Sequence, residues 1–328
     1  MILQLIDGLN GGGAERLCLN IHKNLNSDVT TIYLNSKNNL LDCGLDEKII
    51  GIKSDFKMIR IIKLISLINS CKCDVIITHS PYTSIIANLF FFKRKVFSYL
   101  HNNPDNLKNN IKDKTIINIW VFLLYKFSNK IIGASDTVFP RKSKKNITLF
   151  NSIDCHKFKN TNTDRTKTAI VVGSFTEQKN QLQLINEIEK QKNAIDMTFY
   201  GQGVLKKSCE LKANSFSNNI KFAGFEKNIQ DVYNKTSYVI VASLYESLSL
   251  AWLEAISCGC KLLVLNRSCY SENLKKELTN TIFFDDISDI LSFVISNPTP
   301  LITEELPSKF CQKNWLNRMS EIIIQHND

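Results

Sequence analysis

Glu246 and Glu254 are the only charged residues within a long apolar segment of the chain. Tyr238–Ala242, just before them, is an uninterrupted apolar run, which is typical of a parallel strand covered on both faces. Leu248–Ile256 is apolar on nearly every side, which predicts a buried helix, and Gly259 is a helix stop signal. We therefore expect Glu246 just past the carboxyl end of a strand and Glu254 inside a buried helix.

Two explanations account for charged groups in such a segment. Burying an ionised carboxylate among apolar neighbours costs on the order of several kcal/mol of folding free energy unless the carboxylate has a partner. Each glutamate could simply be satisfied by local backbone N–H groups or by a distant lysine. Alternatively, both line a ligand site, since ligands of open parallel sheets bind outside the carboxyl ends of strands, against helix N-termini. The residues alone leave both explanations open.

A glycine-rich loop near the amino end could approach a phosphate. Ile2–Ile6 predicts a first strand, Asn10–Gly13 a turn, and Ala14–Leu25 a helix. This order brings backbone N–H groups to a place where a phosphate could bind, although a plain surface turn would show the same residues. The loop is neither G-x-G-x-x-G nor a P-loop lysine motif, which disfavours dinucleotide-binding and NTPase functions.

A histidine and a lysine also follow predicted strands. His101 comes directly after the strand predicted at Val96–Leu100, where an imidazole could take part in chemistry or simply hydrogen-bond the loop. Lys179 ends a loop after the strand predicted at Thr168–Val172, and Asn180 is expected to cap the next helix. A cation beside a helix N-terminus is unfavourable unless an anion lies between them. Lys179 therefore indicates a phosphate site, with a solvated lysine as the alternative.

These motifs resemble those of the retaining glycosyltransferases of family 4. Glu246 and Glu254 match the E-x7-E motif of that family, and Gly12–Arg16 (Gly-Gly-Ala-Glu-Arg) resembles its first-loop signature. The family also places a histidine at the position of His101, near the donor sugar and the acceptor.

The loop before Asn180 resembles the family's Gly-Arg…Lys loop, whose two cations hold the donor diphosphate. Lys179 matches the lysine of that loop, whereas Ser174 stands at the position of the arginine. This departure bears on the strength of the diphosphate clamp and on the choice of donor.

The resemblance covers most of the chain and implies an α/β fold of the GT-B type. Such a fold has two Rossmann-like domains with mostly parallel sheets that face a central cleft. Asn151–Asp154 resembles the end of the family's N-terminal domain. The expected parts are an acceptor-side domain at 1–155, a linker at 156–167, a nucleotide-sugar-binding domain at 168–309, and a C-terminal helix at 310–328 that returns to the first domain.

The resemblance also implies roles for individual residues. Glu246 and His101 are the expected catalytic residues, and Glu254 is expected to accept hydrogen bonds from ribose hydroxyls. Departure of a nucleoside diphosphate develops negative charge, which a cation and fixed backbone N–H dipoles stabilise without reorganising. The expected donor-binding residues are Gly12, Gly13, Ser174, Lys179, Leu248, Ser249, Leu250 and Glu254.

The expected function is that of a retaining glycosyltransferase. It would move a hexose or an N-acetylhexosamine from a nucleotide sugar, with a UDP-sugar favoured, to a glycan or a polyprenyl-diphosphate-linked acceptor. The expected process is biosynthesis of a surface polysaccharide, either lipopolysaccharide or capsule. No cofactor is expected, and no metal either, because no D-x-D triplet occurs. The alternative is a nucleotide-sugar epimerase on the same architecture, which would act without an acceptor.

Length and composition are consistent with this interpretation. The chain has 328 residues, 44% of them apolar, which suits two domains that each have a core. Its net charge of +10 favours an anionic partner such as a nucleotide, a diphosphate or a membrane surface. No basic stripe interleaves with aromatic residues, so a nucleic-acid partner is not expected.

The cysteines and apolar runs bear on the compartment. Ten cysteines occur without a C-x-x-C pair, which predicts neither a disulfide framework nor a zinc site. Without a signal peptide at the amino end, the expected location is the cytoplasm. The longest apolar run, Ile119–Tyr125, is too short to cross a bilayer. Basic and apolar residues mix near Lys57–Lys63 and Leu89–Lys95, which favours peripheral docking on the cytoplasmic face of the inner membrane.

Overall fold

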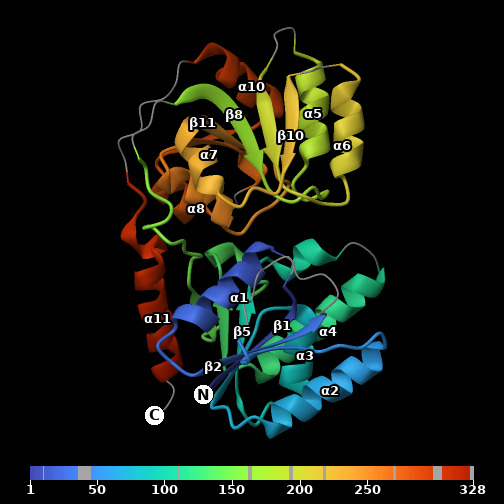
Figure 1. Cartoon of the computed structure of the whole chain (residues 1–328). Coiled ribbons are helices and arrows are strands. Elements are labelled where there is room, and N and C mark those ends of the chain that lie inside the picture. Colours follow the sequence, from blue (N-terminus) through green and yellow to red (C-terminus); the bar gives the residue numbers. More distant parts are fainter. Residues whose placement is uncertain are drawn as a thin grey trace. The chain divides into compact units, whose positions relative to one another are not determined.

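The computed structural model describes residues 1–9, 11–35, 46–108, 111–161, 165–191, 195–216, 219–268, 271–297 and 305–325. The chain divides into two compact units (Figure 1). The N-terminal unit comprises Met1–Asn151 and Lys313–Asp328, and the C-terminal unit comprises Ser152–Gln312. Asn10 of the expected glycine turn and residues 162–164 of the expected linker lie outside the described residues.

The N-terminal unit is built on a seven-stranded parallel sheet with the order β3-β2-β1-β4-β5-β6-β7. The order reverses direction beside β1, because the chain winds outward first through β2 and β3 and then through β4 to β7. This arrangement is that of a Rossmann-like sheet, with its topological switch point between β1 and β4. The strands are β1 Ile2–Gly8, β2 Val29–Asn35, β3 Ile49–Gly51, β4 Val75–Thr78, β5 Lys95–Leu100, β6 Lys130–Gly133 and β7 Asn146–Thr148.

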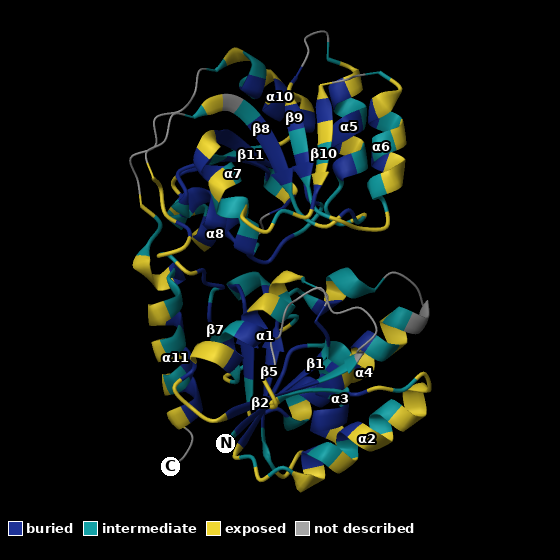
Figure 2. Cartoon of the chain, in the orientation of Figure 1, coloured by how far each residue is buried: buried dark blue, intermediate teal, exposed yellow. Residues whose placement is uncertain are grey.

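Helices cover both faces of this sheet, which explains why successive residues of its central strands are buried (Figure 2). On one face, α1 and α11 pack on alternate strand residues such as Ile2 and Val75. On the other face, α2 and α3 pack on residues such as Leu3 and Ile76, and α4 continues the layer. These helices are α1 Gly13–Asn24, α2 Lys57–Ser70, α3 Pro81–Phe90, α4 Ile111–Phe127 and α11 Gln312–Ile324.

The C-terminal unit repeats the plan with a six-stranded parallel sheet of the order β10-β9-β8-β11-β12-β13. Its switch point lies between β8 and β11. The helices α5, α6 and α10 contribute to one core with the sheet, while α7 and α8 contact β11 and β12 respectively. The strands are β8 Thr166–Val172, β9 Met197–Tyr200, β10 Ile220–Gly224, β11 Thr236–Val241, β12 Lys261–Leu265 and β13 Thr281–Phe284. The helices are α5 Gln181–Glu189, α6 Lys206–Asn214, α7 Ile229–Lys235, α8 Leu250–Ser257, α9 Glu272–Glu277 and α10 Ile287–Ser296.

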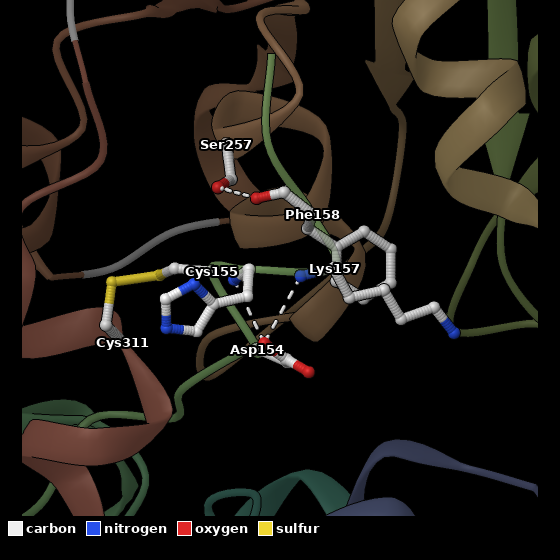
Figure 3. The surroundings of a disulfide bond; sticks show 7 residues. Asp154, Cys155, Lys157, Phe158, Ser257 and Cys311 are labelled. Atoms are coloured by element: carbon white, nitrogen blue, oxygen red, sulfur yellow. Dashed lines mark hydrogen bonds between the residues drawn. A yellow bond between two sulfur atoms is a disulfide. The ribbon is translucent and has the colours of Figure 1, made fainter. Parts of the chain in front are cut away.

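The sequence did not predict a disulfide, yet Cys155 and Cys311 are bonded, with their Cα atoms 5.5 Å apart (Figure 3). The segments that carry them run side by side, since the amide of Ile153 donates to the carbonyl of Phe310 at 2.9 Å and that of Gln312 donates to the carbonyl of Ile153 at 2.8 Å. The two cysteines are 156 positions apart in the sequence. Their spacing therefore carried no sign of the pairing, and this single bond forms although the sequence predicted no disulfide framework.

Candidate active site

The two loops at the switch point of the C-terminal sheet carry the residues that the sequence singled out. One loop follows β8 and leads to α5; the other follows β11 and leads to α8. Because β8 and β11 are neighbours and parallel, both loops leave the sheet at its carboxyl edge. Ligands of such sheets bind at this place.

Lys179 of the first loop and Glu246 of the second form an ion pair, in which Nζ donates to Oε1. The side chains are 19% and 7% exposed, respectively. Two further hydrogen bonds tie the loops together: the amide of Leu244 donates to the carbonyl of Gln178 at 2.8 Å, and Nε2 of Gln178 donates to the carbonyl of Tyr245 at 2.9 Å. The carboxylate of Glu246 is therefore balanced by a lysine that is distant in sequence.

Asn180 occupies the N-cap position of α5, as predicted, but its side chain makes no capping hydrogen bond to the helix. A capping asparagine has an extended backbone, and its side-chain oxygen accepts from the first turn of the helix. Asn180 instead has a left-handed conformation with φ of 58°, and its Nδ2 donates to the carbonyl of Ala242 at 3.1 Å. Its side chain thus holds the start of α5 against the end of β11, beside the ion pair.

Glycines allow the β8 loop to lie close to the loop after β9. The amide of Phe175 donates to the carbonyl of Gln202 at 3.0 Å. A Cβ atom on Gly201, whose φ is 141°, would overlap the carbonyl oxygen of Gly173. Ser174 lies in this loop with its side chain exposed, and its carbonyl accepts from Gln181 at 3.0 Å. The residue that replaces the family's arginine is therefore open to solvent, while its backbone is fixed.

The second glutamate lies in a different environment from the first. Glu254 is in the second turn of α8 and is only 2% exposed, whereas Glu246 lies in the loop. The helix begins at Leu250, so Leu248 and Ser249 precede it rather than forming its first turn. Ser249 is the N-cap, and the first amides of a helix have no partner within the helix itself. The E-x7-E pattern thus spans a loop, a helix start and a buried helix position.

The glycine loop of the N-terminal unit carries an acidic residue that the sequence did not single out. Gly12 is the N-cap of α1 and Gly13 is its first residue. The carboxylate of Glu15 folds back over Gly12, where an added Cβ atom would overlap it. Burial raises the pKa of Glu15, and the nearby Asp7 adds to this effect. Burial also raises the pKa of Asp7. Hydrogen bonds from Ser80 and from the backbone of Thr83 offset part of this rise.

His101 follows β5, as predicted, and stacks with two other rings. The ring centroids of His101 and Tyr99 are 4.7 Å apart, and those of His101 and His79 are 5.4 Å apart. Nε2 of His101 lies 3.2 Å from Nδ1 of His79. Burial lowers the pKa of His101 to about 3, and it lowers the pKa of His79 well below 6.5. His79 follows β4 directly, which was the same signal that drew attention to His101.

Comparison with known proteins finds a family model that matches most of the C-terminal unit. Residues 152–297 match the family model described as "Glycosyl transferases group 1". CapH of Staphylococcus aureus, a capsular polysaccharide biosynthesis glycosyltransferase, is 26% identical over 321 residues, covering 89% of this chain and 87% of CapH. This protein is a glycosyltransferase.

A second relative of this glycosyltransferase comes from Campylobacter jejuni subsp. jejuni serotype O:2. Its name is N-acetylgalactosamine-N,N'-diacetylbacillosaminyl-diphospho-undecaprenol 4-alpha-N-acetylgalactosaminyltransferase. It is 23% identical over 287 residues, which cover 79% of this chain and 78% of the relative. Both relatives are named as transferases, so the comparisons lend no support to the epimerase alternative.

Solved structures show that the glycosyltransferase has a GT-B type of fold. HepE of Anabaena in complex with UDP-glucose superposes with a TM-score of 0.82 at 14% identity, covering 99% of this chain and 100% of HepE. Sucrose-phosphate synthase from Thermosynechococcus elongatus gives a TM-score of 0.80 at 12% identity, covering 99% and 98%. At such low identities the likeness establishes the fold and not the substrate.

The described part of the chain contains neither a membrane-spanning helix nor a cluster of metal-binding side chains. None of its helices is both long and apolar enough to span a membrane. Within the same residues, no group of three or more histidine, cysteine, aspartate or glutamate side chains is arranged to hold a metal ion.

Proposed function

We propose that this glycosyltransferase moves a hexose or an N-acetylhexosamine from a nucleotide sugar to a growing glycan, with retention of the anomeric configuration and without a metal ion. The observation that carries the proposal is the ion pair of Lys179 and Glu246 at the switch point of the C-terminal sheet. A cation and a carboxylate at this edge suit the two ends of a nucleotide sugar, because one can hold the diphosphate and the other a sugar hydroxyl.

The proposed donor site combines this pair with nearby backbone. Lys179, the amides at Leu248, Ser249 and Leu250, and the loop at Ser174 would stabilise the negative charge that develops on the leaving diphosphate. Glu254 would accept from the ribose, which requires the start of α8 to admit the nucleoside, since this carboxylate is buried. In the N-terminal unit, His101 would contact the transferred sugar, and Gly12 and Gly13 would approach the phosphates.

A UDP-sugar is the favoured donor and a lipid-linked glycan the favoured acceptor. HepE was crystallised with UDP and with UDP-glucose, and the Campylobacter relative is named for a diphospho-undecaprenol acceptor. CapH is named for capsular polysaccharide biosynthesis. We assign this chain to the same kind of process, the synthesis of a surface polysaccharide at the cytoplasmic side of the membrane.

The exposed face of α2 favours contact with an anionic membrane. Met58, Ile59 and Ile62 are 68%, 42% and 61% exposed, and the exposed Lys57 and Lys63 lie among them. Apolar side chains can enter the headgroup region while the lysines meet anionic lipid.

The second patch named from the sequence contributes less to this surface. Nη1 of Arg94 donates to the carbonyls of Ile68 and Cys71 at 2.9 and 3.1 Å. This guanidinium therefore binds the carboxyl end of α2, which makes it less available to lipid headgroups. Phe91 beside it is buried. Phe90 and Phe92 remain exposed at 55% and 48%.

A donor panel tests the proposed function. The full-length protein is incubated with UDP-glucose, UDP-galactose, UDP-N-acetylglucosamine, UDP-N-acetylgalactosamine and GDP-mannose, and thermal stabilisation and slow hydrolysis are measured. We expect stabilisation by UDP and turnover of at least one UDP-sugar, with the α-anomer retained when a polyprenyl-diphosphate sugar is added. Absence of binding to every nucleotide would contradict the proposal. Conversion of one UDP-sugar into its epimer without acceptor would also contradict it.

A further inference from the structure

Six side chains of the N-terminal unit form one continuous line of hydrogen bonds that crosses the sheet. The five contacts along it measure 3.2, 2.9, 3.2, 2.9 and 2.9 Å. In order, the line runs through His101, His79, Gln4, Thr31, His22 and Asp46. Most of these side chains are buried, and a buried polar group is costly unless it is hydrogen-bonded. Each of these groups is satisfied by its neighbours in the line, so the orientation of one side chain constrains the next.

The orientation of the Gln4 amide determines which atoms donate in the hydrogen bonds that link Gln4, His79 and His101. One of its amide atoms lies 3.1 Å from the carbonyl oxygen of Cys18, which can only accept, so that atom is the nitrogen. Oε1 of Gln4 therefore faces Nε2 of His79, and this ring nitrogen must carry a proton. His79 is neutral because burial lowers its pKa, so its Nδ1 has a lone pair. It follows that Nε2 of His101 donates to Nδ1 of His79.

We propose that Gln4 and His79 are positioning residues, which hold the His101 ring in its Nε2–H tautomer and in a fixed orientation. Gln4 is completely buried and His79 is 4% exposed, so both are shielded from bulk solvent. Stacking of His101 on Tyr99 restrains the ring plane as well. The inference rests on the proposed role of His101 in sugar transfer.

The consequence concerns what His101 offers to a substrate. With the proton on Nε2 and directed to His79, Nδ1 can only accept a hydrogen bond. An acceptor suits a sugar hydroxyl, which can donate, and disfavours an unprotonated oxygen at the same place. His101 therefore acts as a selective contact for a hydroxyl and not as the proton donor to a leaving group.

Two substitutions of His79 separate its contact with His101 from its contact with Gln4. In His79→Asn the amide oxygen takes the place of Nδ1 and can accept from His101, whereas in His79→Gln the amide nitrogen takes the place of Nε2 and can donate to Gln4. Both side chains are polar and no larger than histidine. The test therefore rests on the difference between the two variants and not on a loss of stability that they share. Thermal unfolding of the two variants checks that they are folded to the same extent.

The main measurement is the ¹⁵N spectrum of the imidazole groups in the full-length protein. With only five histidines in the chain, each signal can be assigned by substitution, and the exposed His156 serves as a reference. We expect His101 to be protonated on Nε2 in the wild type and in His79→Asn, and to be a mixture of tautomers in His79→Gln. Hydrolysis of UDP-glucose should fall by up to about a hundredfold in His79→Gln, as expected for a misplaced contact group.

The outcomes distinguish this inference from the proposed function. A wild-type His101 protonated on Nδ1, or a His79→Gln variant that keeps the Nε2–H tautomer, would overturn the positioning role. If His101→Ala leaves hydrolysis of UDP-glucose unchanged, the proposed contact of His101 with the sugar is wrong, while the spectrum still decides whether His79 sets the tautomer.

Discussion

Lys179 donates a hydrogen bond from Nζ to Oε1 of Glu246, across the switch point between β8 and β11. The two residues lie 67 positions apart and are brought together by loops that hydrogen-bond to each other. Each charge is thereby balanced without a ligand. A bound diphosphate would compete with the carboxylate for the ammonium, so donor binding and rearrangement of this pair are expected to be coupled.

This competition predicts opposite effects of two substitutions on nucleotide affinity. Glu246→Gln removes the carboxylate and leaves Lys179 to the diphosphate, so UDP should bind more tightly than to the wild type. Lys179→Met removes the cation, so UDP should bind more weakly. Both variants should lower sugar transfer by about a hundredfold or more, the usual cost of losing one electrostatic stabiliser. Calorimetric titration with UDP and an initial-rate assay measure the two effects.

A matched control for Lys179→Met is Lys212→Met. Lys212 pairs with Glu189 at 2.6 Å, on the more exposed surface of α5 and α6. Exposed pairs of this kind contribute little, so UDP affinity and transfer should stay at the wild-type level. Wild-type affinity for UDP in Lys179→Met would remove Lys179 from the donor site.

Ser174→Arg tests whether the β8 loop faces the phosphates. The serine side chain is exposed, and the backbone carbonyl that holds the loop does not depend on the side chain. An arginine here should add a charge-assisted hydrogen bond and tighten UDP binding by about tenfold or more. Binding of uridine, which lacks the diphosphate, should not change. Equal gains for UDP and uridine would place the new guanidinium away from the phosphates.

Two glycine-to-alanine substitutions should differ in their effect on stability. In Gly201→Ala the new Cβ meets the backbone oxygen of Gly173 at a positive φ, so unfolding free energy should fall by about 1–3 kcal/mol. In Gly12→Ala the Cβ meets only the end of the flexible Glu15 side chain, so the loss should be smaller, about 0.5–1 kcal/mol, chiefly because alanine is a poorer N-cap residue than glycine. Denaturant unfolding measures both. Similar losses in the two variants would show that backbone crowding is not the cause.

The buried imidazoles predict a loss of stability in mild acid. Burial lowers the pKa of His101 from 6.5 to about 3, so the unfolded chain binds more protons than the folded chain between these values. Stability is then complete above about pH 6.5 and falls as the pH drops toward 3, by at most about 1.4 kcal/mol per pH unit for one group. His101→Gln should remove this share, so the variant should gain stability relative to the wild type as the pH falls.

Unfolding curves of the two proteins between about pH 7.5 and pH 5 measure this difference. Asp7 and Glu15 have raised pKa values, which give a pH dependence of the opposite sign, but both proteins contain them and their effect cancels in the comparison. Parallel curves for the two proteins would mean that His101 takes up its proton equally in the folded and unfolded chains.

Much of the site could be predicted because local patterns decide it. The apolar run that ends at Ala242 makes β11 a buried parallel strand, and the residues after such a strand must lie at its carboxyl edge. His101 after β5 and Lys179 after β8 follow by the same logic. The position of Asn180 was found from the sequence as well, but its left-handed backbone was not, and its side chain contacts Ala242, which is 62 positions away in the sequence.

By itself, then, the sequence determined which segments are strands and helices and which polar residues follow the strands, since apolar period and turn residues act over a few positions. Only the tertiary structure decided which of those residues meet. The ion pair of Lys179 with Glu246, the line from His101 to His79, and the bond of Cys155 with Cys311 all depend on the order of strands and on the return of distant segments. These contacts join segments that are distant in the sequence, and local patterns of apolar and turn residues do not predict which distant segments meet.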